Sequence, residues 1–191
     1  MRKVILDIET KNTFDEVGAY DPAKLDLALL VIYDYGTGTY RSFMESDLLK
    51  LWKVLENTDQ IIGFNSDHFD IPLLNKYYPG DLRKIKSIDL MRSVVNSFGR
   101  RLPLDAIAAG TLGKQKSGHG LQAITWWRQG EIEKIRKYCE DDVRITKEIY
   151  EYALNNKSLK YKIGVDYGTI PIDTSAWEEK HEHKINYTLP F

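Results

Sequence analysis

The residues best suited to chemistry stand near the start of the chain, in the segment Lys3–Thr10 (KVILDIET). This segment is apolar enough to be a central β-strand that is covered on both faces. Because alternate side chains of a strand point to opposite faces, Asp7 and Glu9 share a face that should be largely buried. Two buried carboxylates repel each other and lose hydration, and a divalent cation compensates both effects. The alternative is a strand that ends early and leaves both acids in solvent.

A third acid, Asp70, follows a short apolar segment by a few residues. Pro72 fits the first turn of a helix, so Asp70 is expected near the start of that helix. Taken alone, the position favours a helix cap over a catalytic role.

We predict a long helix from Glu131 to Leu154. At ~100° per residue, one side of it carries an apolar stripe. The stripe comprises Ile132, Ile135, Cys139, Val143, Thr146, Ile149, Tyr150 and Ala153. Asp142 falls roughly 50° from the centre of this stripe, whereas Asp141 falls roughly 150° away. Tyr138 lies one turn before Asp142 on the same flank. Asp142 is therefore expected to face the protein, where it needs a compensating partner, and Asp141 to face water.

The elements that position these acids follow from hydrophobic patterning. Beyond the first strand, the sequence predicts strands at 27–34, 39–43, 60–64 and 86–90, helices at 48–55, 91–98 and 104–112, a loop over 12–24, a basic loop over 113–120 and a hairpin over 161–172. The first three strands are closely connected and should form an antiparallel meander, whereas strands reached through helices should be parallel. We therefore expect the α/β class, with a mixed sheet and helices on both faces. The predicted domain covers residues 1–155, and residues 156–191 form a hairpin and tail that pack on it or trail from it.

Composition limits the function classes. The 191 residues are 42% hydrophobic and 29% charged, which is typical of a globular protein. Between Arg83 and Lys137 twelve Lys or Arg residues face four Asp or Glu residues, although the whole chain has a net charge of −1. A basic half beside an acidic half suits a protein that holds a polyanion and metal ions, although an ordinary solvated surface would look the same. The single cysteine, Cys139, and the lack of a membrane-length apolar run or a signal peptide predict a cytoplasmic protein without membrane contact.

The order and surroundings of the acids resemble the DEDD superfamily of 3′–5′ exonucleases, which has the ribonuclease H-like fold. Residues 7–10 (DIET) resemble the first exonuclease motif, Asn65 with Phe69 and Asp70 the second, and Tyr138-x-x-x-Asp142 the third in its tyrosine form. The continuation over residues 70–74 (DIPLL) is similar to the proofreading domain of family B DNA polymerases. Residues 110–114 (GTLGK) and 126–130 (WWRQG) resemble stand-alone predicted exonucleases of this group. The resemblance covers roughly residues 1–155.

The resemblance implies a mechanism in which the acids Asp7, Glu9, Asp70 and Asp142 bind two Mg²⁺ or Mn²⁺ ions, typically about 3.5–4 Å apart. It also implies that Asp7 bridges both ions, that Glu9 approaches the terminal 3′-hydroxyl and that Tyr138 orients the attacking water. Thr10, Asn65 and Phe69 would contact the substrate. The implied partner is nucleic acid, with single-stranded DNA favoured and RNA also open, and the products are nucleoside 5′-monophosphates.

Two other function classes stay open at this point. A catalytically idle ribonuclease H-like module could bind nucleic acid or a partner protein, but such a module would not need four carboxylates and Tyr138. A different nuclease on the same fold, such as a ribonuclease H or a resolvase-like endonuclease, would also use metal ions. The Tyr-x-x-x-Asp spacing speaks against that second alternative.

Overall fold

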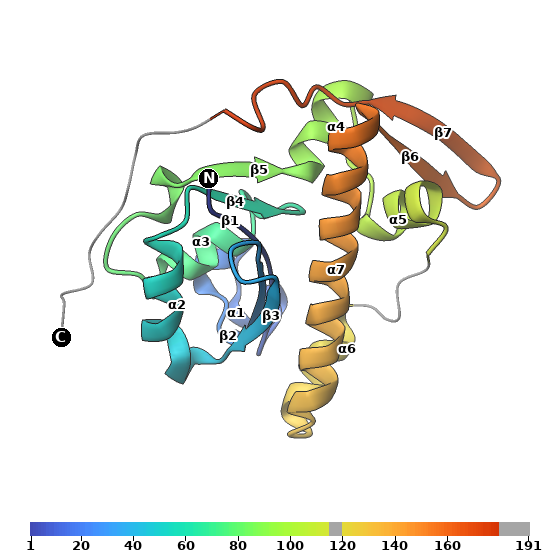
Figure 1. Ribbon diagram of the computed structural model, residues 1–191. Coiled ribbons are helices and arrows are strands. Elements are labelled where there is room, and N and C mark those ends of the chain that lie inside the picture. The colour runs from blue at the N-terminus through green and yellow to red at the C-terminus, as the bar shows by residue number, and fades with distance from the viewer. Residues whose placement is uncertain (115–119, 180–191) are drawn as a thin grey trace.

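The computed structural model describes residues 1–114 and 120–179, and it confirms the predicted mixed α/β architecture (Figure 1). A five-stranded sheet has the order β3-β2-β1-β4-β5. Its strands are β1 (Lys3–Thr10), β2 (Leu27–Asp34), β3 (Thr39–Phe43), β4 (Gln60–Gly63) and β5 (Lys86–Asp89). β1 pairs antiparallel with β2 and parallel with β4, so the meander and the parallel strands meet at β1. The strand with the two acids is thus the central strand of the sheet.

Helices cover both faces of this sheet (Figure 1). The α-helices are α1 (Phe14–Val17), α2 (Leu48–Leu55), α3 (Asp70–Asn75), α4 (Leu90–Phe98), α5 (Leu104–Leu112), α6 (Gly120–Arg128) and α7 (Ile132–Asn156), and short 3₁₀ helices span Pro22–Lys24, Glu45–Asp47 and Leu82–Lys84. Val4, Leu6 and Ile8 of β1 pack with α2 and α3 in one core cluster. Ile5, on the other face, packs with α4, α5, α6 and α7 in a second cluster. The alternation predicted for β1 is confirmed, and it turns the face of Asp7 and Glu9 towards α7.

Two helices were not expected from the sequence. The prediction of a loop over residues 12–24 is wrong for α1, whose single turn is held by reciprocal capping between Thr13 and Glu16. A helix this short shows no apolar stripe. α6 was also missed, because its apolar side chains are spread around the helix: Ala123 and Ile124 are buried, whereas Leu121 is 72% exposed.

A separate hairpin follows α7. It consists of β6 (Ser158–Ile163) and β7 (Asp166–Pro171), so it begins three residues earlier than the prediction of 161–172. α5 covers the edge of β6: the Thr111 hydroxyl donates to the carbonyl of Lys160 and accepts from its N–H, at 2.8 and 2.9 Å. A Cβ atom on Gly110 would lie 2.4 Å from the backbone of Tyr161. Gly110 and Thr111 therefore have a structural role, because they let α5 pack closely against the backbone of β6.

No helix in the described ranges is long and apolar enough to cross a membrane. Of the predicted basic loop, residues 115–119 lie outside the described part of the chain, as do residues 180–191 of the predicted tail.

Candidate active site

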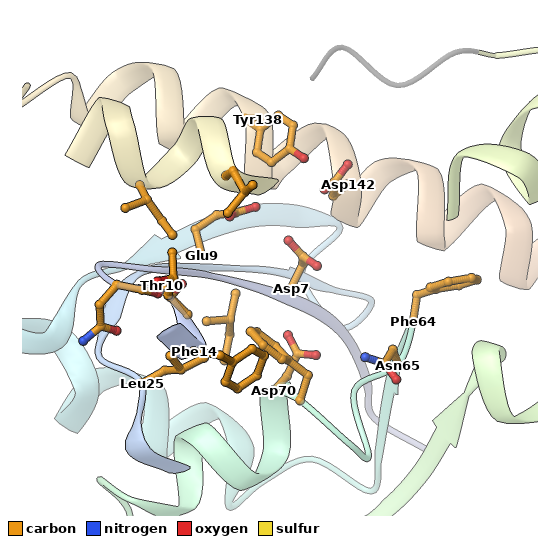
Figure 2. Close-up of a pocket in the computed structure, with 16 residues that line it drawn as sticks. Asp7, Glu9, Thr10, Phe14, Leu25, Phe64, Asn65, Asp70, Tyr138 and Asp142 are labelled. Carbon is orange, nitrogen blue, oxygen red and sulfur yellow. Dashed lines mark hydrogen bonds between the residues drawn. The ribbon is translucent and has the colours of Figure 1, made fainter. Parts of the chain in front are cut away.

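Three carboxylates from two elements converge beside the centre of the sheet (Figure 2). Asp7 and Glu9 come from β1 and Asp142 comes from α7, and one oxygen atom of each lies within 4.8 Å of the others. Glu9 is 7% exposed and Asp142 is 3% exposed. The convergence arises because the apolar stripe of α7 packs on the face of β1 that carries both acids. Hard divalent cations prefer oxygen ligands of this kind, so the donor set fits Mg²⁺ or Mn²⁺.

Asp70 faces this cluster from the other side of the cavity. In Figure 2, Asp7 lies between Asp142 and Asp70. Asp70 is the first residue of α3 and is 4% exposed, and the cap position itself is occupied by Phe69. Burial raises the pKa of Asp70 well above its usual value, and the charge of Asp7 raises it further, although a backbone hydrogen bond from Ile8 acts in the opposite direction. Burial and the nearby charge of Asp7 both raise the pKa of Asp70 and so favour its protonated form in the metal-free protein.

All eight predicted site residues line one cavity of about 440 Å³. Its walls come from β1 and the segment that follows it, from the segment between β4 and α3, and from α6 and α7. The lining comprises Asp7, Ile8, Glu9, Thr10, Asn12, Thr13, Phe14, Leu25, Phe64, Asn65, Phe69, Asp70, Leu121, Ile124, Tyr138 and Asp142. The cavity is thus lined by acids and by aromatic rings, and the rings of Phe14 and Phe69 meet edge to face with centroids 6.1 Å apart.

Tyr138 lies one helical turn before Asp142 and is 3% exposed. Its ring meets Trp126 of α6 edge to face, at a centroid separation of 5.9 Å. The helix missed from the sequence therefore fixes the orientation of the tyrosine that the sequence singled out.

Cys139 belongs to the predicted apolar stripe of α7, and it is fully buried. The structure adds a contact that the sequence did not reveal: its thiol donates to the carbonyl oxygen of Asp7 at 3.2 Å and lies 3.4 Å from the Asp7 carboxylate. Burial raises the pKa of Cys139 well above its usual value, and the charges of Asp7 and Glu9 add to the effect. Cys139 therefore remains a neutral thiol that supports Asp7 and is a poor nucleophile.

The turn between β4 and α3 is tightly constrained. A Cβ atom on Gly63 would lie 2.4 Å from the hydroxyl of Ser66, so only glycine fits there. Asn65 has a φ of 67°, in the left-handed region that asparagine tolerates better than most residues. Its side-chain oxygen accepts a hydrogen bond from Arg101. This turn places Asn65 and Asp70 in the wall of the cavity.

Asp89, at the end of β5, holds this turn in place and was missed from the sequence. Its carboxylate accepts hydrogen bonds from the N–H groups of Asn65 at 2.8 Å and Asp67 at 3.1 Å. It also caps α4 through the N–H groups of Met91 at 2.9 Å and Arg92 at 3.3 Å. The side chain is 6% exposed. The predicted edge strand over residues 86–90 contains Asp89 as β5 does, but the sequence does not reveal that its side chain binds the turn before α3.

The electrostatics of Asp70 predict a pH effect on stability. In EDTA, the free energy of unfolding should fall as the pH rises from about 4 through the raised pKa, because the folded protein binds the Asp70 proton more tightly than the unfolded chain does. Asp70→Asn should remove this component and be more stable than the parent at pH 8. Urea unfolding at pH 5 and pH 8, with Asp141→Asn as control, measures it. An equal difference between parent and variant at both pH values would contradict the assignment.

The chain matches known proteins over most of its length. The family model described as the RNase_H superfamily matches residues 4–154, which include the five-stranded sheet except Lys3 and all but the last two residues of α7. The structure resembles the family B DNA polymerase from the hyperthermophilic archaeon Pyrobaculum calidifontis, with a TM-score of 0.60 and 20% sequence identity over 81% of this chain. The matched part is 24% of that polymerase chain, and identity at this level supports a common fold only. No curated protein matches the sequence. Because the family model covers most of its length, the chain belongs to the RNase_H superfamily.

Proposed function

We propose that this protein is a metal-dependent 3′–5′ exonuclease that hydrolyses the terminal phosphodiester bond of nucleic acid, preferentially single-stranded DNA, to nucleoside 5′-monophosphates. The observation that carries the proposal is the convergence of Asp7, Glu9 and Asp142, with Asp70 facing them across the same cavity. Membership of the RNase_H superfamily supports a nuclease, and the fold shared with a DNA polymerase chain agrees with it.

The four carboxylates are the groups that would hold the metal ions. Two bound Mg²⁺ or Mn²⁺ ions would supply Lewis acidity, which activates water and stabilises the leaving 3′-oxygen. Asp7 lies between the other acids and is the residue best placed to serve both ions. Without cations, the buried charges would repel one another.

The other lining residues would bind and orient the substrate. The Tyr138 hydroxyl orients the attacking water, and Glu9 accepts a hydrogen bond from the terminal 3′-hydroxyl. Water adds to phosphorus, the bond from phosphorus to the 3′-oxygen of the preceding nucleotide breaks, and that oxygen gains a proton. The rings of Phe14 and Phe69 line the cavity where a nucleobase can pack, because aromatic faces stack on bases without regard to sequence. Thr10 and Asn65 offer polar atoms to the sugar and phosphate.

The direct test compares three substrates with Mn²⁺ or with EDTA: a 5′-labelled single strand, a single strand blocked at its 3′ end, and a closed single-stranded circle. The proposal expects a ladder that shortens from the 3′ end of the first substrate only, and only with metal. Cleavage of the circle would identify an endonuclease on this fold. Binding without cleavage of any substrate would identify a nucleic-acid-binding module instead.

Asp89→Asn should lower kcat by about tenfold or more, because small displacements of groups that position the substrate are costly. The asparagine side chain keeps one oxygen acceptor, but its NH₂ group would face a backbone N–H that the second carboxylate oxygen binds in the parent. The two donors repel each other, so the turn that carries Asn65 and Asp70 should shift. The rate should be measured well below the melting temperature of the variant, with KM reported separately.

Asp81→Asn is the matched control for this prediction. Asp81 caps a short 3₁₀ helix through the N–H of Arg83 and does not line the cavity. If Asp89→Asn loses stability but keeps the parental kcat, Asp89 is only a cap of α4.

A further inference from the structure

The hairpin β6–β7 presents one face to solvent. Cross-strand partners share a face, so the register places Lys160 beside Thr169 and Lys162 beside Tyr167 on one side. These four residues are exposed, and Tyr167 is 80% exposed. The opposite side carries Leu159 and Ile170, which are buried in the core. The hairpin is thus anchored on one face and open on the other, and it lies beyond the part of the chain that the family model matches.

Exposed apolar surface is concentrated at the far end of this hairpin. Ile163, Val165 and Tyr167 are 42%, 91% and 80% exposed, and they make up three of the seven large apolar or aromatic side chains that are exposed in the described ranges. Tyr167 lies on the outward face, Val165 lies in the turn and Ile163 lies on the opposite face, so Tyr167 and Val165 are the two that can add apolar surface to the outward face.

The charge of this region favours a polyanion. Within the described residues, the structure gives neither Lys160 nor Lys162 a carboxylate partner, whereas Lys114 is paired with Glu148. Lys162 and Lys114 both line a groove of about 330 Å³ between the hairpin and the end of α5. The acid of β7, Asp166, lies opposite Ile163 and therefore on the other face. Lysines next to an exposed aromatic ring are the combination with which proteins hold single strands.

Two exposed arginines connect the hairpin with the candidate active site. Arg101 donates to the side chain of Asn65, which lines the cavity. Arg100 lies over the ring of Phe98 at 5.1 Å, and that ring contacts Tyr161 of β6 with centroids 5.0 Å apart. Arg101 is three positions after Phe98, which is at most about 11 Å of extended chain. These contacts connect the rim of the cavity with Tyr161, which lies on the face of β6 opposite Lys160 and Lys162. A strand that follows the two arginines therefore reaches the hairpin and must continue past Tyr161 to contact the outward face.

We propose that the outward face of the hairpin, formed by Lys160, Lys162 and Tyr167, is a second binding surface for single-stranded nucleic acid, which reaches it from the active site across Arg101 and Arg100. The inference rests on the proposed function for the direction of the strand, but the surface itself is argued from exposure and charge. A strand that reaches the outward face must be longer than one that only fills the cavity, so longer oligonucleotides should bind more tightly.

The test measures binding and not hydrolysis. Fluorescence anisotropy with labelled dT4 and dT16 is recorded in Ca²⁺, and a gel checks that both oligonucleotides stay intact. The parent should bind dT16 more tightly than dT4. The triple variant Lys160→Ala, Lys162→Ala, Tyr167→Ala should weaken dT16 binding about tenfold and change dT4 binding less than twofold. Losing two phosphate contacts should also lower the slope of log Kd against log salt by about 1.4.

Controls separate this surface from general charge and folding effects. Lys50→Ala, Lys53→Ala removes two exposed lysines from α2, which packs on the opposite face of the sheet, and should leave dT16 binding unchanged. Tyr167→Phe keeps the stacking ring and should bind as the parent does. Lys162→Glu alone provides a second variant if the triple variant unfolds. Repeating the titration with rU16 tests whether the surface accepts RNA as well.

Three results would overturn the proposal: no length dependence in the parent, equal losses for dT4 and dT16, or unchanged dT16 binding by the triple variant. If the triple variant instead converts a dimer to a monomer without changing affinity, the surface joins two copies of the chain. The exonuclease proposal is judged separately, by degradation of a 3′ end in Mn²⁺. If the parent binds with length dependence but degrades no substrate, the proposal of a second binding surface stands and the proposed exonuclease function is wrong.

Discussion

Asp142→Asn is expected to lower the rate of 3′-end hydrolysis by ~10² or more, since a metal-supported reaction depends on the charge of every carboxylate ligand. The change keeps the size of the side chain and removes one negative charge from a cluster whose oxygens lie within 4.8 Å of one another. Because it relieves repulsion, the metal-free fold should be as stable as the parent or slightly more stable. A gel-based rate assay in Mn²⁺ and a thermal melt in EDTA measure the two quantities.

The neighbouring acid supplies the matched control. Asp141 was expected to face water, and the structure places it at the surface, where its partly exposed carboxylate pairs with Arg144. Exposed ion pairs contribute little, so Asp141→Asn should stay within about ±0.5 kcal/mol in stability and near the parental rate. If Asp141→Asn were the inactive variant, the metal site would lie on a different face of α7. Equal activity of both variants and the parent would remove Asp142 from the mechanism.

The part of the site that the sequence could predict depends on short-range periodicity. A period of two in β1 is sufficient to place Asp7 and Glu9 on one face, and a period of 3.6 in α7 separates Asp142 from Asp141. The pattern in α7 is strong because one side of the helix is buried in the core. β1 is buried on both faces, and there the spacing of two residues alone places both acids on one face. The mixed sheet could also be predicted from the sequence, because its strands are short apolar segments bounded by turns.

What the sequence did not reveal are contacts between elements. Asp89 acts on Asn65 across 24 residues, and Cys139 donates to Asp7 across 132 residues. No local pattern reports such contacts, because they exist only once β5 lies beside β4 and α7 lies on β1. α6 was missed for a related reason: its orientation is set by packing on α7 and β1 and not by an apolar stripe of its own.

Tyr138→Phe is the second variant for which a large loss is expected. The change removes one hydroxyl group from a buried ring that stays packed against Trp126. If that hydroxyl orients the attacking water, kcat should fall by ~10², while KM and the affinity for Mn²⁺ change little. Single-turnover rates with a short oligonucleotide separate the chemical step from product release.

Tyr150→Phe is the control for this prediction, because it removes the same group from the same helix away from the cavity. The Tyr150 hydroxyl accepts from Lys3 at 3.2 Å and donates to Glu178 at 2.8 Å, so its loss should lower the melting temperature and leave kcat unchanged. The pair therefore separates a stabilising hydroxyl from a catalytic one. If Tyr138→Phe also changes only the melting temperature, Tyr138 is a packing residue, and the water must be oriented by the carboxylates alone.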